Sequence, residues 1–93
     1  MKKEFNMIVI ENETKKVVKK EGDYDTTNAI YYTKEDTGWT ATDAYTGTSI
    51  VVNKPTKKDC QDSIKTFLPK LKKIRNGENY LKGVINYQEL IEK

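Results

Sequence analysis

Residues 56–75 read TKKDCQDSIKTFLPKLKKIR, and the spacing of their apolar side chains decides how the chain folds. Six of them recur at intervals of three and four residues, and these are Cys60, Ile64, Phe67, Leu68, Leu71 and Ile74. A repeat near 3.6 residues places all six on one face of an α-helix. The segment therefore predicts an amphipathic helix whose apolar face packs on the rest of the chain.

The same segment carries signals for where the helix begins and ends. Thr56 follows Pro55 and can cap the helix N-terminus, and Asp59 stands three residues later as in a capping box. Pro69 predicts a kink or a break, because proline lacks the amide N–H and its ring clashes with the preceding turn. The dipeptide at 76–77, Asn-Gly, predicts the end of the helix.

Positive charge is concentrated in this helix. Residues 56–75 hold seven of the 17 basic residues and two of the 14 acidic ones, a formal charge of +5 in a chain whose total is +3. The candidate contact residues for nucleic acid or an acidic partner are Lys58, Lys65, Lys70, Lys72, Lys73 and Arg75. Three of these lysines are seven residues apart and line one flank of the helix. The alternative is an ordinary solvated face, on which cations near the C-terminus are favoured by the helix dipole.

Three β-strands are predicted before the helix, at 29–33, 39–43 and 49–53. Gly38 and Gly47 lie in the short turns between them, where glycine can adopt a positive φ. In the middle strand Trp39, Ala41 and Asp43 alternate with two threonines, which indicates that one of its faces is buried. Three strands joined by short turns form an antiparallel meander.

The N-terminal part predicts a hairpin, with strands at 5–10 and 15–20. Residues 21–28 have no period and predict a mobile loop. After the helix, Tyr80 to Ile85 could form a strand or turn, and Asn86 with Glu89 could cap a short last helix. The prediction is a single α+β domain over residues 1–93. It has an antiparallel sheet of four or five strands, made of the hairpin and the meander, packed against the kinked helix.

Aromatic residues of the β block are candidates for contact with a partner. The proposed anchors are Tyr31, Trp39, Tyr45 and Thr46. Tyr31 and Tyr32 point to opposite faces of their strand, so one of them is expected to be exposed. The alternative is structural: Trp39 fills the core between sheet and helix, while Asp43 and Gly47 shape a turn.

The composition argues against catalysis and metal binding. The chain has no histidine and one cysteine, Cys60, which lies on the apolar face of the helix and is expected to be a small buried hydrophobe. The common zinc ligand sets, a disulfide and a histidine base are therefore absent. The carboxylate pairs Glu35–Asp36 and Asp23–Asp25 have turn and solvation explanations. We expect no catalytic residues, no metal and no cofactor.

Several motifs of the chain resemble those of a known family. The Gly38-Trp39 strand, the Thr46-Gly47 turn and the helix start at 56–59 (Thr-Lys-Lys-Asp) resemble the arm-type DNA-binding domains of phage and transposon integrases. The resemblance covers about residues 29–71 and implies a three-stranded sheet plus one helix, with the sheet entering the major groove of DNA. The Lys-, Asn- and Thr-rich composition is similar to that of accessory proteins of Gram-positive phages and plasmids. It implies an inhibitor that blocks one host macromolecule, as anti-CRISPR proteins do.

The sequence therefore predicts a small non-enzymatic protein-binding module, a phage or mobile-element accessory or inhibitor protein. The expected partner is a host or phage protein. The alternative is a nucleic-acid-binding domain that uses the basic flank of the helix, and a homodimer is a third possibility. The longest apolar run, residues 7–10, is far too short to span a bilayer, so we expect no membrane partner and a cytoplasmic location.

Overall fold

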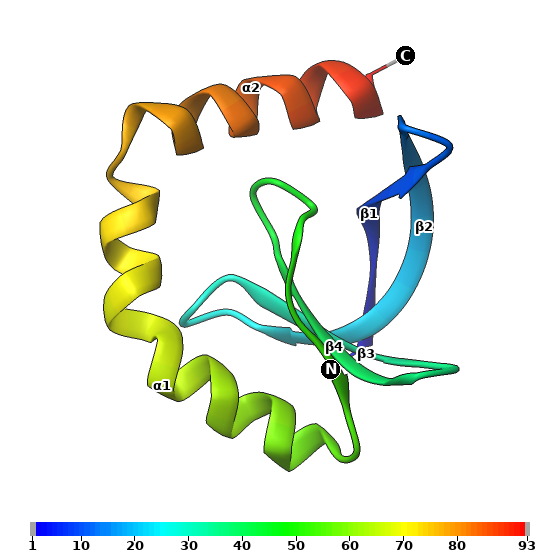
Figure 1. Cartoon of the computed structure of the whole chain (residues 1–93), viewed down its shortest axis with the longest axis vertical. Helices are drawn as coiled ribbons and strands as arrows, with labels where there is room; N and C mark the ends of the chain where they lie inside the picture. The colour runs from blue at the N-terminus through cyan, green and yellow to red at the C-terminus, as the bar shows by residue number, and fades with distance from the viewer. Residues whose placement is uncertain (1, 93) are drawn as a thin grey trace.

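The computed structural model describes residues 2–92 as one antiparallel sheet followed by two helices (Figure 1). The elements are β1 (Lys2–Glu11), β2 (Thr14–Asp25), β3 (Ile30–Glu35), β4 (Gly38–Asp43), β5 (Ser49–Lys54), α1 (Lys57–Arg75) and α2 (Glu78–Ile91). The strands pair in the order in which they follow one another in the chain, and the sheet is not closed. The predicted α+β class, the hairpin and the meander are confirmed.

β2 is longer than the sequence predicted, and the prediction of a loop over 21–28 is wrong for residues 21–25. β2 continues to Asp25, and residues 23–25 pair with β3. Gly22 makes this possible, since a Cβ there would lie 2.6 Å from both the Thr33 Cγ2 and the Tyr32 carbonyl oxygen. The turn that follows is held by the Asp25 carboxylate, which accepts hydrogen bonds from the Thr27 and Asn28 amides.

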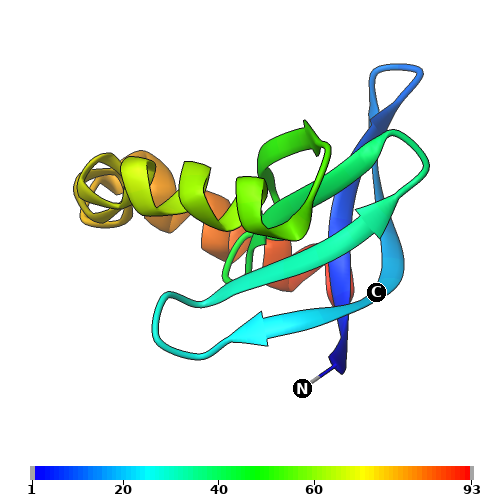
Figure 2. The ribbon, with the colours of Figure 1, turned by 90° about the horizontal axis from the view of Figure 1, so that it is seen from below.

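The main core lies between the sheet and α1, as Figure 2 shows from below. Its buried residues are Ile30, Tyr32, Ala41, Cys60, Ile64 and Leu71. Trp39 and Phe67 are partly buried and pack against this core. The predicted apolar face of α1 and the buried Cys60 are thus confirmed, whereas Ile74 at the end of the face remains half exposed.

The opposite face of β3 and β4 is also covered. Thr33, Thr40 and Thr42 lie on this face and are buried, because the long β1–β2 hairpin curls over them. Two contacts hold the curl. The Phe5 ring stacks on the Tyr31 ring at a centroid distance of 4.2 Å, and the Ile8 N–H donates to the carbonyl oxygen of Gly47 at 2.8 Å.

α1 begins as the sequence predicted. Thr56 is the N-cap, and its side chain accepts a hydrogen bond from the Asp59 amide at 3.1 Å. Pro69 lies inside α1 without ending it, and the helix axis bends along its length (Figure 1). Asn76 caps the C-terminus, as predicted.

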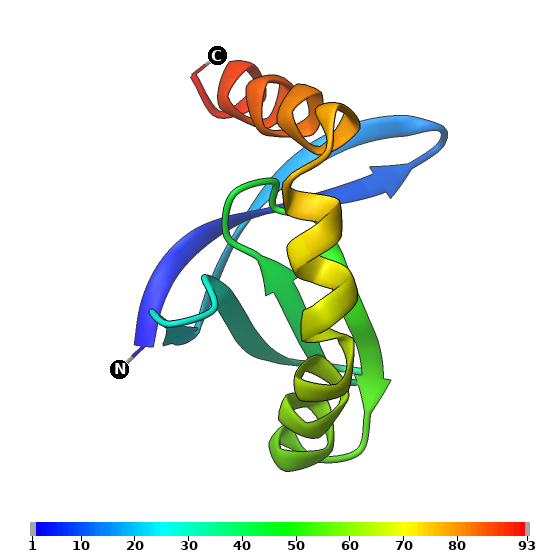
Figure 3. The same ribbon diagram turned by 90° about the vertical axis from the view of Figure 1, so that its left-hand side faces the viewer.

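The tail forms a second helix. The predicted strand or turn over 80–85 is wrong, and the predicted last helix begins eight residues earlier than Asn86. α2 runs without a break from Glu78 to Ile91. Gly83 lowers the helix propensity of its middle, but contacts with the rest of the molecule hold the segment helical. Figure 3 shows α2 crossing beyond the end of α1. Within residues 2–92, neither helix is long and apolar enough to cross a membrane.

Candidate functional site

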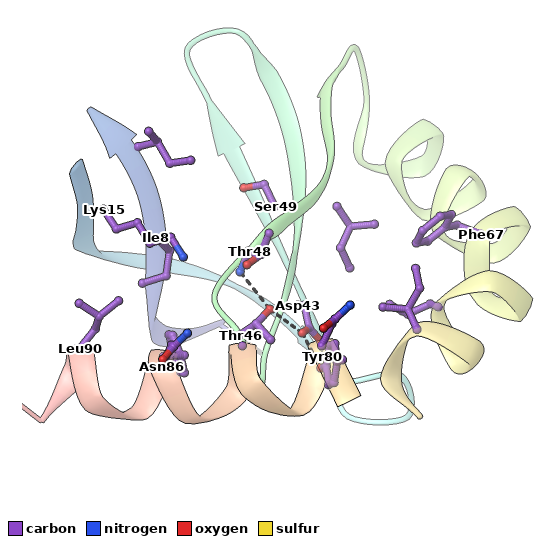
Figure 4. A pocket seen from close by; sticks show the side chains of 17 residues that line it. Ile8, Lys15, Asp43, Thr46, Thr48, Ser49, Phe67, Tyr80, Asn86 and Leu90 are labelled. Carbon is purple, nitrogen blue, oxygen red and sulfur yellow. Dashed lines mark hydrogen bonds between the residues drawn. The ribbon is translucent and has the colours of Figure 1, made fainter. Parts of the chain in front are cut away.

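A cleft of about 590 Å³ separates α2 from the sheet (Figure 4). Its walls come from all the strands except β3, from the segment between β4 and β5, and from both helices. Most of the lining is apolar and includes Ile8, Ile10, Ile50, Phe67, Leu71 and Leu90. The cleft exists because α2 is held away from the sheet: no residue within 78–91 is buried.

α2 is fastened at one end by a cluster of polar groups around Asp43, which we name the Asp43 clamp. Asp43 is 2% exposed. Its Oδ1 accepts a hydrogen bond from Arg75 Nη2 at 2.6 Å, and its Oδ2 accepts from Tyr80 Oη at 2.6 Å and from Thr46 Oγ1 at 2.7 Å. The clamp therefore joins the end of β4, the end of α1 and the start of α2.

Electrostatics keep the donors of the clamp protonated. Burial and the hydrogen bond to Asp43 raise the pKa of Tyr80 above its usual value. Burial opposes the charge of Arg75, but the hydrogen bond and charge of Asp43 outweigh it and raise the pKa of that guanidinium. With three donors directed at it, the Asp43 carboxylate holds these elements together.

A second attachment holds α2 in its middle. Tyr87 Oη donates to the carbonyl oxygen of Asn6 in β1 at 3.1 Å. The ring of Tyr87 passes so close to Gly47 that a Cβ on that residue would lie 2.6 Å from it. Gly47 also has a φ of +67°, so both the backbone and the space require glycine there.

The four proposed anchors of the β block have different surroundings. Trp39 is half-buried against the core, and Tyr31 is half-buried between the rings of Phe5 and Tyr24. Thr46 is half-buried and donates its hydroxyl proton to the Asp43 clamp. Tyr45 is 52% exposed and stands beside Arg75. Of the four, Tyr45 alone presents most of its surface to solvent. Tyr32 is buried and Tyr31 is half-buried because both faces of β3 are covered, so the prediction that one of these two tyrosines is exposed is wrong.

The six basic residues that the sequence proposed as contacts separate into two groups. Lys58, Lys65, Lys70, Lys72 and Lys73 are exposed, and among residues 2–92 none of them has a carboxylate oxygen within 4.0 Å. Arg75 does not face outward as the sequence predicted. It pairs with Asp43 and donates to the carbonyl oxygens of Asn28 and Ala29, because α1 ends directly beside these groups.

The sequence predicted neither the cleft nor the role of Asp43 as the hydrogen-bond acceptor that joins the two helices to β4. Tyr80 and Tyr87, which fasten α2, are seven residues apart, so they lie on one face of a helix. That spacing was the available signal. In the part of the chain that the structure describes, no group of three or more His, Cys, Asp or Glu side chains could hold a metal ion.

No protein-family model matches this chain, and no curated protein and no solved structure matches it. The resemblances to integrase arm-type domains and to anti-CRISPR proteins stay predictions. The fold and the surfaces described above therefore supply the argument about function.

Proposed function

We propose that this chain is a small non-enzymatic protein-binding module, and that it contacts its partner through the outward face of α2. The observation that carries the proposal is a pair of exposed apolar side chains on that face. Leu81 is 61% exposed and Ile85 is 49% exposed. They are four residues apart and belong to the face of the helix that does not line the cleft.

A pair of this kind is typical of helix-mediated recognition. Apolar residues at positions i and i+4 of an amphipathic helix serve as anchors in a hydrophobic groove of the partner. The few residues with the largest desolvated area supply most of the binding free energy at such surfaces. The partner class that fits is a protein with an apolar groove. Occlusion of such a groove is the way in which an accessory or inhibitor protein of a phage or mobile element would act.

The test is capture of a protein partner with a matched pair of variants. Leu81→Glu/Ile85→Glu places charge on the proposed contact, whereas Val52→Glu places it on β5, where Val52 is similarly exposed at 51%. We expect the first variant to lose a partner that the wild-type chain captures saturably, and the second to retain it. Loss in both variants, or in neither, would contradict the proposal. A concentration-dependent dimer in sedimentation that Leu81→Glu/Ile85→Glu abolishes would assign this surface to self-association instead.

A second candidate is nucleic-acid binding through the five exposed lysines of α1. The observation that favours it is their freedom from ion pairs in the described part of the chain, which leaves their charge available to phosphates. If Lys58, Lys65 and Lys72 each neutralise one phosphate, the logarithm of the affinity for duplex DNA should fall with the logarithm of salt at a slope of about −2.7.

Titration of labelled duplex and single-stranded DNA at several salt concentrations measures that slope. Replacing the three lysines by Glu should abolish binding. Replacing Lys15, Lys16 and Lys19 of β2 by Glu makes the same change in net charge elsewhere and should preserve it. Undetectable or salt-insensitive binding by the wild-type chain discards this candidate.

A further inference from the structure

The two ends of the cleft under α2 differ in chemical character. Phe67 and Leu71 of α1 line one end, and Lys15 of β2 lines the other with Asn86 and Leu90 of α2. In Figure 4 the side chains of Lys15 and Phe67 stand at opposite sides of the cleft, with Ile8, Ser49 and Thr48 between them. The cleft is therefore an apolar channel with one cation at its end.

We propose that this cleft binds a free fatty carboxylate, with its alkyl chain along the apolar walls and its carboxylate beside Lys15. The proposal is independent of the protein partner considered above, because it uses the opposite face of α2. The volume of about 590 Å³ lies within the range of small-molecule sites, which are concave and mostly apolar with a few polar groups that set the orientation.

Charge selects the head group and its position. Asp43 also borders the cleft, but Arg75, Tyr80 and Thr46 already occupy its oxygens. At the other end, Lys15 has no carboxylate oxygen within 4.0 Å among residues 2–92, and Asn86 lines the same small hollow. Glu89 borders the same hollow and opposes an anion there. Lys15 lines both the cleft and this hollow, whereas Glu89 borders only the hollow. An anionic head inside the cleft is therefore favoured by Lys15, and Glu89 weakens its binding.

The alkyl chain provides most of the expected affinity. Each methylene group transferred from water to an apolar site tightens binding by about fourfold. Affinity should therefore rise steadily with chain length until the chain fills the cleft, and should then stop rising. A nonspecific association with exposed apolar residues has no such limit.

Calorimetry on the full chain with octanoate, decanoate, laurate and myristate, each below its micelle concentration, tests these expectations. We expect one site, a dissociation constant that falls about fourfold per methylene and then levels off, and weaker binding of the alcohol with the same chain as laurate. Absence of saturable binding by all four acids would overturn the proposal. So would an affinity independent of chain length, or equal affinity for the acid and the alcohol.

Charge variants test the position of the head group. Lys15→Gln should weaken laurate binding by up to about fivefold, the upper end of the range for an exposed ion pair, and Glu89→Gln should strengthen it by a similar factor. Lys16→Gln is the matched control, because Lys16 points to the other face of β2 and pairs with Glu11. Equal effects of Lys15→Gln and Lys16→Gln would overturn the placement of the carboxylate.

A variant that fills the cleft with a side chain tests whether the alkyl chain of the ligand lies there. Gly83 lines the cleft, and a Cβ there would meet the Thr46 methyl at an ordinary 3.7 Å, so Gly83→Leu can project its side chain into the cleft without a backbone clash. Gln88→Leu adds the same side chain on α2 outside the cleft lining. We expect the first variant to abolish laurate binding and the second to retain it, with circular dichroism confirming the helix in both. Retained binding by a folded Gly83→Leu variant would overturn the proposal.

Discussion

The two helices of this chain are held by different forces. α1 buries Cys60, Ile64 and Leu71 against the sheet and contributes half of the main core. α2 buries no residue within 78–91, and the hydroxyl groups of Tyr80 and Tyr87 attach it to the rest of the molecule. Apolar burial fixes the position of α1, whereas polar attachments keep α2 at a distance and leave a cleft beneath it. Elements with few buried apolar contacts open locally at low free energy, so α2 should open well before the whole domain unfolds.

The largest expected effect comes from removing a core side chain of α1. Ile64 is 1% exposed, so Ile64→Ala deletes buried methyl and methylene groups and leaves a cavity; it should lower the free energy of unfolding by about 3 kcal/mol. Ile85→Ala on α2 should cost less than about 0.5 kcal/mol, because Ile85 is half exposed. Urea denaturation followed by circular dichroism measures both. Similar losses in the two variants would mean that α2 shares the core after all.

The next effect comes from the Asp43 clamp, which joins the two helices. Asp43→Asn removes the charge that pairs with the partly buried Arg75 and weakens the acceptor of Tyr80, so we expect a loss of about 2–3 kcal/mol. Asp36→Asn in the exposed turn between β3 and β4 is the matched control and should change stability by less than about 0.5 kcal/mol. Hydrogen exchange should show faster opening of α2 in Asp43→Asn. Unchanged exchange in α2 would contradict the role of the clamp.

The features that were predicted correctly depend on residues close together in the sequence, and the features that were missed depend on residues far apart. The start of α1 depends on Thr56 and Asp59, three residues apart, and its buried face on a repeat within one helix. Both were predicted correctly because every signal is local. The end of β2 depends on pairing with β3, and its irregular local pattern around Gly22 indicated a loop instead.

The candidate site was harder to predict because it depends on contacts between distant segments. Arg75 lies in the last turn of α1, where the helix dipole alone is a sufficient reason for a cation. In the structure, Arg75 also donates to Asp43, which lies 32 residues earlier in the chain. Tyr87 reaches Asn6 across 81 residues. Residue type and spacing indicated that Asp43 shapes a turn. They could not indicate which hydrogen-bond donors from distant segments would reach its carboxylate.

A smaller effect is a fall in the free energy of unfolding at alkaline pH, caused by one tyrosine packed under α1 and one tyrosine on α2. Burial raises the pKa of Tyr32, in the core under α1, to about 12, and it raises the pKa of Tyr80 on α2. The unfolded chain loses these protons near its ordinary pKa of 10, whereas the folded chain keeps them. The stabilisation is therefore complete below about pH 10 and is lost as the pH rises further, by up to about 1.4 kcal/mol per pH unit for each tyrosine.

Urea denaturation at about pH 9 and about pH 11 measures this loss. Tyr32→Phe and Tyr80→Phe should each reduce the pH dependence. Tyr80→Phe should act mainly on the opening of α2, and Tyr32→Phe on global unfolding. A stability that stays constant over this range would contradict the protected hydroxyl groups.

The smallest effect is a gain confined to α2. Gly83→Ala should stabilise the helix by about 0.5–1 kcal/mol, because alanine reduces the backbone freedom of the unfolded segment and its Cβ meets the Thr46 methyl at 3.7 Å without strain. Gly22→Ala in β2 is the contrasting variant, since its Cβ would lie 2.6 Å from Thr33 and from the Tyr32 backbone and should destabilise the sheet. If α2 opens separately, the gain from Gly83→Ala will appear as slower amide exchange in 78–91 with little change in the global unfolding midpoint. An equal shift in both would show that α2 and the core unfold together, and that the hydroxyl attachments couple the two helices as strongly as apolar burial would.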